Sequence, residues 1–444
     1  MKKEVIAMRK LLCLLLALCL MLPAAAIAEA QMTIIPREAG FDYDFTLTEA
    51  WVRLHWKGPN EKGIKTLYAP DGHFSGSIGL RCGEGGKYTV TVEDISLRQL
   101  FKQTVQIPAA TSYAAPTGKA GGAVSQLQLS ETATGFAYSF LAPGTDYMLL
   151  YFRSVQEEAC FPVYPANDEG LYQGEVVSDL TYARTLFKVQ IRGGNGSVKR
   201  EGEVRKAFLT PEAPAQQPGR LSGVVVCIDP GHQENHHGFR EDLGPGLSGS
   251  VLNTGGMAQG KTTLRRESIV VLETGMILRE LLMKEGATVV MTRLKQDDFR
   301  TNLDRCKIAE EGGAHILLRL HCNLTSNKNK TGIQVYGPLN SSYAHDVASP
   351  AEYRALGQAF LDEMKKAVGY ELSEKTGRVT LNDTYVGNNW AKMLCFLVEM
   401  GYMSNASEDI KLATPEYQTM LAKGMVEGVY QVALLRGWVA PAGE

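Results

Sequence analysis

The sequence has no marked excess of charge of either sign. Its 46 lysine and arginine residues nearly balance 48 aspartate and glutamate residues, so the formal net charge is −2 over 444 residues. Proteins that bind nucleic acid or adhere to an anionic membrane surface usually carry a basic excess or a basic amphipathic segment. The composition therefore argues against both kinds of partner.

Cysteines are few and scattered. None of the eight forms a CxxC pair, which argues against a zinc site built from cysteines. Six of them lie beyond residue 30, and an exported location would permit disulfides without assigning their pairing. Cys227, Cys322 and Cys395 lie in apolar runs typical of strands, so we interpret them as small buried hydrophobic residues.

The longest apolar run lies at the amino terminus and is short. Leu11–Leu22 has twelve residues, fewer than a helix needs to span a bilayer. Lysines and an arginine precede it, and the small-residue run Ala24–Ala30 follows. This order predicts a secretory signal peptide over residues 1–30, with an uncleaved anchor as the alternative. We therefore expect a secreted or cell-envelope protein with no stable membrane insertion after cleavage.

The amino-terminal half reads as β-structure in two stretches, residues 31–109 and 123–210. Apolar and polar residues alternate within short segments that Gly-, Pro- and Asn-bearing turns separate, a pattern typical of strands. Both stretches are predicted to form small β-sandwich-like domains. Ala109–Gly122 suits a linker, and the Pro-rich residues 211–220 suit a semi-rigid one.

Two interpretations are open for three aromatic residues of the first stretch: Trp51, Trp56 and Tyr88. They could form a carbohydrate-binding face, which would make a cell-wall polymer a partner of the β-rich half. At this spacing, aromatic side chains are more often part of the core.

Residues 221–440 show a different pattern, with strands alternating with helices. This alternation predicts an α/β domain with a mostly parallel sheet and flanking helices. The expected strands are Val224–Ile228, Thr288–Met291, Ile316–Leu320, Ile333–Tyr336 and Met393–Val398. The expected helices are Arg266–Glu285, Asn302–Glu311, Pro350–Val368 and Pro415–Arg436.

Four chemically active side chains stand at comparable places in this domain. His232 follows the first strand, where the turn Asp229-Pro230-Gly231 stops the strand and its glycine lets the backbone turn sharply. Glu267 opens the first helix. His321 ends the third strand and Glu399 ends the fifth. Because ligands bind at the carboxyl edge of a parallel sheet, we expect the four to meet at one rim.

This set of residue types points to a metal site. Two histidines and a carboxylate are the ligands of a catalytic zinc with an open position for water. A second carboxylate that is not a ligand can act as general base on that water. Each residue alone is weak evidence, but Glu399 directly after the apolar strand MLCFLV is hard to explain structurally, because unpaired carboxylates are seldom buried.

These residues stand in blocks that resemble a known family, the zinc-dependent N-acetylmuramoyl-L-alanine amidases of type 3, which cut peptidoglycan. The resemblance covers about residues 222–437, and the order of the blocks is more specific than any one of them. Four blocks carry it: Ile228-Asp229-Pro230-Gly231-His232, Arg266-Glu267, Leu320-His321-Cys322-Asn323 and Leu397 through Asn405. Met291-Thr292-Arg293 also resembles the family's segment after its second strand.

The resemblance implies a role for each of the four residues. His232, Glu267 and His321 would bind one zinc ion per chain, and Glu399 would be the catalytic glutamate. The implied reaction is hydrolysis of the amide that joins N-acetylmuramic acid to the L-alanine of the stem peptide. Zinc would polarise the carbonyl and activate water, with Glu399 as general base.

The sequence departs from the family pattern in the segment after His232. Gln233 stands where the family usually has a second glycine, and the gap to Glu267 is 267 − 232 = 35 residues, longer than the common form. The insert His236–Lys261 is rich in glycine. We predict that it is a mobile loop near the metal that shapes substrate entry.

Other polar residues near these blocks have open interpretations. His236 and His237 are expected to be exposed or to face substrate, and His315 to be structural. Asp229 would orient His232 or bond backbone amides. Asn323 and the stretch Asn388-Asn389-Trp390 would contact sugar or peptide, or cap loops. Two arginines would meet substrate carboxylates or pair on the surface: Arg293 and Arg378.

Two other functions remain open at this stage. One is a non-catalytic wall-binding or regulatory module on a decayed amidase fold, which would be expected to have lost a ligand or the glutamate, although this chain retains all four. The other is a zinc hydrolase that acts on another amide, such as a peptidase.

Overall fold

A computed structural model describes most of the chain beyond the predicted signal peptide. The described residues are 32–113, 115–132, 134–154, 157–178, 186–205, 218–233, 238–253, 257–296, 298–371 and 375–441. The predicted signal peptide, most of the Pro-rich linker, and His236 and His237 lie outside them. The chain divides into two compact units, and among described residues the first contains 32–94, 98–117 and 159–162. The domain boundaries drawn from the sequence stay a prediction.

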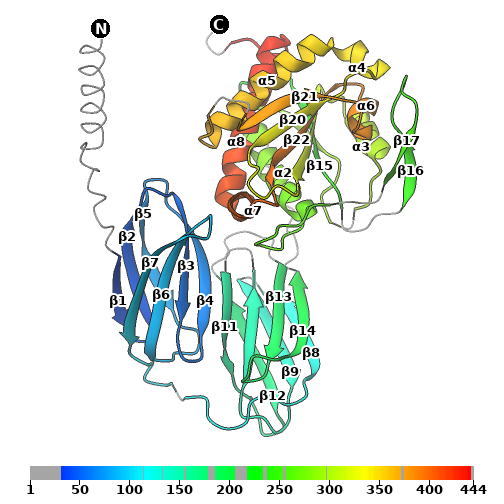
Figure 1. Cartoon of the computed structure of the whole chain (residues 1–444). Coiled ribbons are helices and arrows are strands. Elements are labelled where there is room, and N and C mark those ends of the chain that lie inside the picture. Colours follow the sequence, from blue (N-terminus) through cyan, green and yellow to red (C-terminus); the bar gives the residue numbers. More distant parts are fainter. Residues whose placement is uncertain are drawn as a thin grey trace, which may run out of the picture. The chain divides into compact units, whose positions relative to one another are not determined.

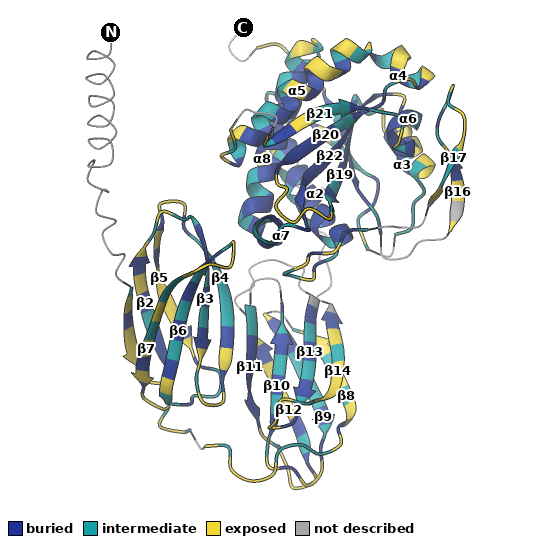
Figure 2. Ribbon diagram, in the orientation of Figure 1, coloured by how far each residue is buried: buried dark blue, intermediate teal, exposed yellow. Residues whose placement is uncertain are grey.

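The first unit is built from antiparallel strands. β1, β2 and β5 form one sheet in that order, and β4, β3, β6 and β7 are neighbours in another. The strands are β1 (Thr33–Arg37), β2 (Gly40–Thr46), β3 (Trp51–Lys57), β4 (Lys62–Tyr68), β5 (His73–Gly79), β6 (Gly86–Asp94) and β7 (Gln99–Ile107). Figure 2 shows the alternation of buried and exposed positions along them.

The aromatic residues singled out in this unit are buried. Trp51 is 6% exposed, Trp56 3% and Tyr88 0%, and Trp56 and Tyr88 pack in the hydrophobic core with Phe41 and Phe45. The core interpretation is therefore confirmed. The alternative, a carbohydrate-binding face made from these three rings, is wrong, because such a face would have to be exposed.

The second β-rich stretch is also made of strands around an aromatic core. β12, β9 and β8 form one sheet, and β14, β13 and β10 are neighbours in another. Phe136, Phe152 and Phe187 form mutual ring contacts in its interior. The strands are β8 (Ser125–Glu131), β9 (Gly135–Leu141), β10 (Met148–Arg153), β11 (Glu157–Val163), β12 (Leu171–Val177), β13 (Leu186–Arg192) and β14 (Val198–Arg205).

The carboxyl-terminal domain contains a six-stranded sheet in the order β18-β15-β19-β22-β20-β21. All neighbours are parallel except β20 and β22, which pair antiparallel. The sheet is therefore mixed, and β20 and β21 run opposite to the other four. The strands are β15 (Val225–Pro230), β18 (Thr288–Met291), β19 (Ile316–Asn323), β20 (Ile333–Gly337), β21 (Gly377–Leu381) and β22 (Leu394–Tyr402).

Helices cover this sheet (Figure 1). They are α2 (Glu267–Lys284), α3 (Asn302–Glu311), α4 (Ser342–Val347), α5 (Pro350–Ala367), α6 (Val386–Trp390), α7 (Ala406–Leu412) and α8 (Pro415–Leu435). α8 lies against α2 and α5. It approaches α5 closely because Gly428 has no side chain: a Cβ there would lie 2.6 Å from Cδ2 of Phe360. No helix among the described residues is long and apolar enough to cross a membrane.

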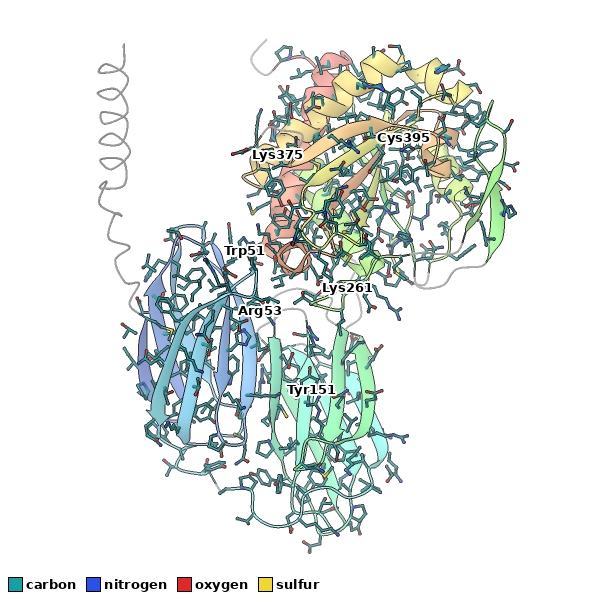
Figure 3. All side chains as sticks on the ribbon, in the orientation of Figure 1. Trp51, Arg53, Tyr151, Lys261, Lys375 and Cys395 are labelled. Carbon is teal, nitrogen blue, oxygen red and sulfur yellow. The ribbon has the colours of Figure 1, made fainter. Side chains whose placement is uncertain are left out.

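Two strands extend beyond their predicted ends. β19 continues to Asn323 and β22 to Tyr402, so His321 and Glu399 lie within strands and not at their ends. The two are partners in the strand register. The strands were predicted to end before these polar residues, but both polar side chains lie within paired strands and face the site. Cys227, Cys322 and Cys395 are buried as predicted, with Cys395 inside the sheet (Figure 3).

The insert after His232 contains a β-hairpin where we predicted a mobile loop. β16 (Phe239–Asp242) pairs antiparallel with β17 (Ser250–Asn253). The indole of Trp390 donates to the carbonyl of Asp242 over 2.9 Å, and the Asn389 amide donates to the carbonyl of Leu243 over 2.9 Å. These contacts attach the hairpin to α6. Asn388 and Asn389 are fully buried, so the interpretation that they contact sugar or peptide is wrong.

Candidate metal centre

Three of the four predicted site residues converge on one point. His232 follows β15, Glu267 is the first residue of α2, and His321 lies in β19. Their ligand atoms all lie within 4.8 Å of one another. The two imidazole rings are 4.9 Å apart between centroids and nearly perpendicular, at 78°. The structure thus brings together the donors that the sequence predicted as zinc ligands.

The Glu267 carboxylate lies between the two rings. Its Oε2 is 3.2 Å from Nε2 of His232, and its Oε1 is 3.0 Å from Nδ1 of His321. The backbone N–H groups of Ala258 and Cys322 donate to it over 2.8 and 2.9 Å. Burial would raise the pKa of Glu267, but the two histidines more than offset this effect and hold the pKa below its usual value. Glu267 is therefore an ionised acceptor in a fixed position.

The donor set fits a zinc ion. Nε2 of His321 is buried and has no hydrogen-bond partner among the described residues. Burial, partly opposed by Glu267, lowers the pKa of His321 to about 4, so at neutral pH the ring is the neutral imidazole that binds metals. Two imidazoles and one carboxylate form the three-ligand set of a catalytic zinc site.

Glu399 lies beside this set in the neighbouring strand. It is the register partner of His321, and paired residues on adjacent strands point to the same face of a sheet. It is 9% exposed, and its Oε2 has no hydrogen-bond partner in the described part of the chain. Burial, and then repulsion by Glu267, raise the pKa of Glu399 well above its usual value. A cation bound between the two carboxylates would relieve this repulsion.

The turn before His232 works differently from our prediction. Gly231 is not in the left-handed region, whereas His232 is, with φ of 59°. A non-glycine residue in that region is strained and marks a site held by its surroundings. Gly231 is instead needed for space, because a Cβ there would lie 2.3 Å from Cε1 and 2.5 Å from Nε2 of His321. The glycine lets one metal-site histidine pack against the backbone that carries the other.

Substituting Gly231 by alanine should therefore weaken metal binding. The added Cβ must displace the His321 ring, and displacing a support of a ligand typically costs about 10–100-fold in metal affinity. Competition with a chromophoric chelator measures this change. Gly79→Ala is a matched control, because a Cβ at Gly79 meets no atom within 4 Å. Unchanged zinc affinity in Gly231→Ala would show that the close approach is not needed.

Asp229 contacts two buried arginines and not the His232 ring. Its carboxylate, 0% exposed, accepts from Nη1 of Arg305 over 2.5 Å and from Nε of Arg319 over 2.9 Å. Thr292 donates to it over 2.6 Å. Burial would raise the pKa of Asp229, but the arginines hold it below its usual range. Arg305 also donates to the carbonyl of His232 over 3.0 Å, so Asp229 positions His232 through Arg305 and the backbone.

Arg293 reinforces the same turn. It is 1% exposed and donates to the carbonyls of Pro230, Gly231 and Ser268 over 2.8, 3.0 and 2.8 Å. Because Ser268 follows Glu267, this guanidinium joins the turn of one ligand to the helix of another. Both sequence interpretations of Arg293, a contact to substrate carboxylates or a surface pair, are wrong.

Loss of the Asp229 carboxylate should strongly destabilise the domain. In Asp229→Ala, Arg305 and Arg319 stay buried at 3% and 4% exposure without their shared counter-ion. Breaking such a buried pair costs about 3–5 kcal/mol of unfolding free energy, measurable by denaturant titration. Glu310→Ala, which removes an exposed pair with Lys392, should cost less than about 1 kcal/mol. Equal losses in the two variants would contradict this account.

A cavity of about 570 Å³ opens over the four residues. The hairpin contributes Glu241, Val251 and Leu252 to its lining. Glu241 accepts from the backbone and the side-chain amide of Asn302 over 2.9 and 2.7 Å, and Asn302 in turn accepts from Arg319 over 2.6 Å. The inserted hairpin is thus a wall of the cavity, connected by hydrogen bonds to the arginine cluster beneath the metal-binding turn.

His315 and Asn323, two further candidates from the sequence, form local hydrogen bonds, and several residues that line the cavity were not predicted. His315 accepts from the backbone N–H of Val225 over 3.0 Å, which confirms its structural interpretation. Asn323 lines the cavity and also accepts from the N–H of Leu324. Arg319 stands two residues before His321 in β19 and so lies on the same face of the strand. This spacing could have predicted that an arginine lies close to the site. Reasoning from the sequence missed these lining residues: Asn302, Arg305, Arg319, Thr384 and Tyr385.

Comparison with known proteins agrees with the resemblance. Residues 226–431 match the Amidase_3 family, described as N-acetylmuramoyl-L-alanine amidase. The germination-specific N-acetylmuramoyl-L-alanine amidase of Bacillus subtilis is 26% identical over 235 residues, which cover 49% of this chain and 83% of the relative. The probable cell wall amidase LytH of Staphylococcus aureus is 27% identical over 213 residues, covering 47% of this chain and 58% of that protein.

Among solved structures, an N-acetylmuramoyl-L-alanine amidase from Clostridium difficile aligns with a TM-score of 0.38 and 24% identity, covering 48% of this chain and 98% of the other. The sequence matches confirm the predicted resemblance of the carboxyl-terminal domain to the type 3 amidases. The family match begins at residue 226 and ends at residue 431.

Proposed function

We propose that this protein is a zinc-dependent peptidoglycan hydrolase that cleaves the amide between N-acetylmuramic acid and the L-alanine of the stem peptide. The observation that carries the proposal is the convergence of His232, Glu267 and His321 within 4.8 Å, with Glu399 as register partner of His321. The family match of residues 226–431 supports the substrate class.

His232, Glu267 and His321 would hold the zinc ion, one per chain. When bound, zinc supplies Lewis acidity toward the amide carbonyl and lowers the pKa of a water molecule to about 7. The backbone donors to Glu267 and the arginines beneath His232 keep these donors in place before substrate arrives.

Glu399 moves the proton. One of its carboxylate oxygens accepts a proton from the water that attacks the lactyl carbonyl, and the same carboxyl then donates the proton to the departing nitrogen of L-alanine. The C–N bond breaks, and the products are a lactyl carboxylate and a free alanine amine. The Oε2 atom without a partner among the described residues is available for this role.

The location and the partners follow from the substrate. A protein that cuts cell-wall peptidoglycan acts outside the cytoplasm, as the predicted signal peptide over residues 1–30 would require. Binding of a cell-wall polymer by the β-rich half remains part of the proposal, but Trp51, Trp56 and Tyr88 do not carry it, because they are buried.

Digestion of purified sacculi, with and without a zinc chelator, tests the proposal. We expect released peptides with a free amino terminus on alanine, identified by mass spectrometry, and no release after chelation. Release of peptides cut at another amide would favour a zinc peptidase. No release by protein with one zinc per chain would overturn the amidase proposal, and protein that binds no zinc and releases nothing would favour the non-catalytic wall-binding module.

A further inference from the structure

The row of residues that contains Glu399 continues across the sheet to its edge. In β22, Glu399 is paired with His321 of β19 on one side and with Gln334 of β20 on the other. Gln334 is paired in turn with Arg378 of the edge strand β21. Residues paired in this way point to the same face of a sheet. A metal ligand, the catalytic glutamate, a glutamine and an arginine therefore lie in one row on one face.

The opposite face of these strands is covered by α5, so the row of Arg378 lies on the side of the sheet that faces away from this helix. A Cβ at Gly357 of α5 would lie 3.0 Å from Cγ1 of Val379, so Val379 faces the helix. Its neighbour Arg378 therefore points the other way, since successive side chains alternate. Figure 1 shows β22, β20 and β21 side by side. At about 4.8 Å per strand, the Cα of Arg378 lies about 10 Å from that of Glu399.

Arg378 has the properties of a binding residue. Its side chain is exposed, and this side chain forms no ion pair or hydrogen bond with residues that the structure describes. A second exposed cation, Lys330, lies over the Tyr402 ring at 5.2 Å. Burial raises the pKa of Tyr336, Glu399 adds to the increase, and Lys330 and Arg378 oppose it. Lys330, Arg378 and Glu399 are therefore all close enough to Tyr336 to change its pKa.

The chemistry of the substrate indicates what these cations would meet. In the proposed substrate, the lactyl carboxyl of N-acetylmuramic acid is consumed in the scissile amide, and the sugars are uncharged N-acetyl sugars. Carboxylates therefore belong to the peptide. A carboxylate on the residue after L-alanine lies within about 7 Å of the scissile bond, since a residue spans at most about 3.5 Å. A carboxylate about 7 Å from a scissile bond held at Glu399 is therefore within reach of the Arg378 side chain, whose Cα lies about 10 Å from that of Glu399.

We propose that Arg378, aided by Lys330, binds the carboxylate of the residue that follows L-alanine in the stem peptide. Arg378 would then set the direction of the peptide along β22, β20 and β21, and would favour peptides with a free carboxylate over those with a carboxamide at this position. This inference rests on the proposed amidase function.

Kinetics on a matched pair of soluble substrates test the inference. The two are N-acetylmuramoyl-L-alanyl peptides that carry either a carboxylate or a carboxamide at the residue after alanine. For Arg378→Gln we expect KM for the carboxylate substrate to rise about fivefold to tenfold with kcat unchanged. KM for the carboxamide should stay as in the parent protein. Zinc content should also be unchanged, because Arg378 lies three strands away from His321 in the sheet and is not among the converging donors.

Arg354→Gln is the matched control, since it removes the same charge from an exposed position on α5, the helix on the opposite face. The inference is overturned if Arg378→Gln changes KM equally for both substrates or changes neither. Failure of the proposed function gives a different result, because the zinc-loaded parent protein would then cleave neither substrate.

Discussion

Glu399→Gln lowers kcat for amide hydrolysis by roughly 10²–10⁴-fold, the range that a positioned general acid–base group contributes, and leaves zinc bound. Glutamine has nearly the same shape as glutamate but cannot accept the proton of water at neutral pH. Glu399 is not among the three residues whose donors converge, so its replacement leaves the ligand set intact.

Steady-state kinetics together with metal analysis of the same preparation measure this effect. Glu416→Gln, at a half-buried position in the first turn of α8, is the control for loss of one carboxylate and should keep the parent activity. Activity of Glu399→Gln within twofold of the parent would rule out Glu399 as the base. Loss of zinc from this variant would instead make Glu399 a fourth ligand.

His321→Ala abolishes both zinc binding and activity. The substitution leaves two donors where a catalytic zinc site needs three, and it leaves Oε1 of Glu267 without its 3.0 Å contact. We expect less than about 0.1 zinc per chain after dialysis and hydrolysis at the level of the chelated parent protein.

The control for this variant is His345→Ala, which removes an exposed histidine of α4. It should retain one zinc per chain and full activity. The unfolding transition separates two explanations for an inactive His321→Ala protein: a misfolded chain would lose the cooperative transition, whereas an intact fold with a missing ligand would keep it. A His321→Ala protein that retains zinc and activity would contradict the ligand assignment.

The helices and most strands of the carboxyl-terminal domain could be predicted because their signals are local. Apolar periodicity and capping residues lie within each segment, as at Thr301, whose side chain forms a capping box with Asp304 at the start of α3. The four site residues could be found for the same reason, since each stands in a short recognisable block.

The parts that were missed depend on contacts between distant segments. Burial of Arg293 depends on carbonyls more than 20 residues away in the chain, and the need for Gly231 depends on the position of His321. The hairpin was missed because its strands have four residues each within a glycine-rich segment that reads as a loop. The row from His321 to Arg378 requires the strand order, which sequence periodicity does not contain.

Cleavage in ¹⁸O-labelled water is the most direct test of the central claim, that these residues activate water against the lactyl amide. The substrate is the soluble N-acetylmuramoyl-L-alanyl peptide, and both products are analysed by mass spectrometry. For zinc-loaded parent protein we predict one ¹⁸O atom in the lactyl carboxylate and none in the peptide, whose alanine carries a free amine. Label in a new carboxylate of the peptide, or equal cleavage by the chelated protein, would contradict the account.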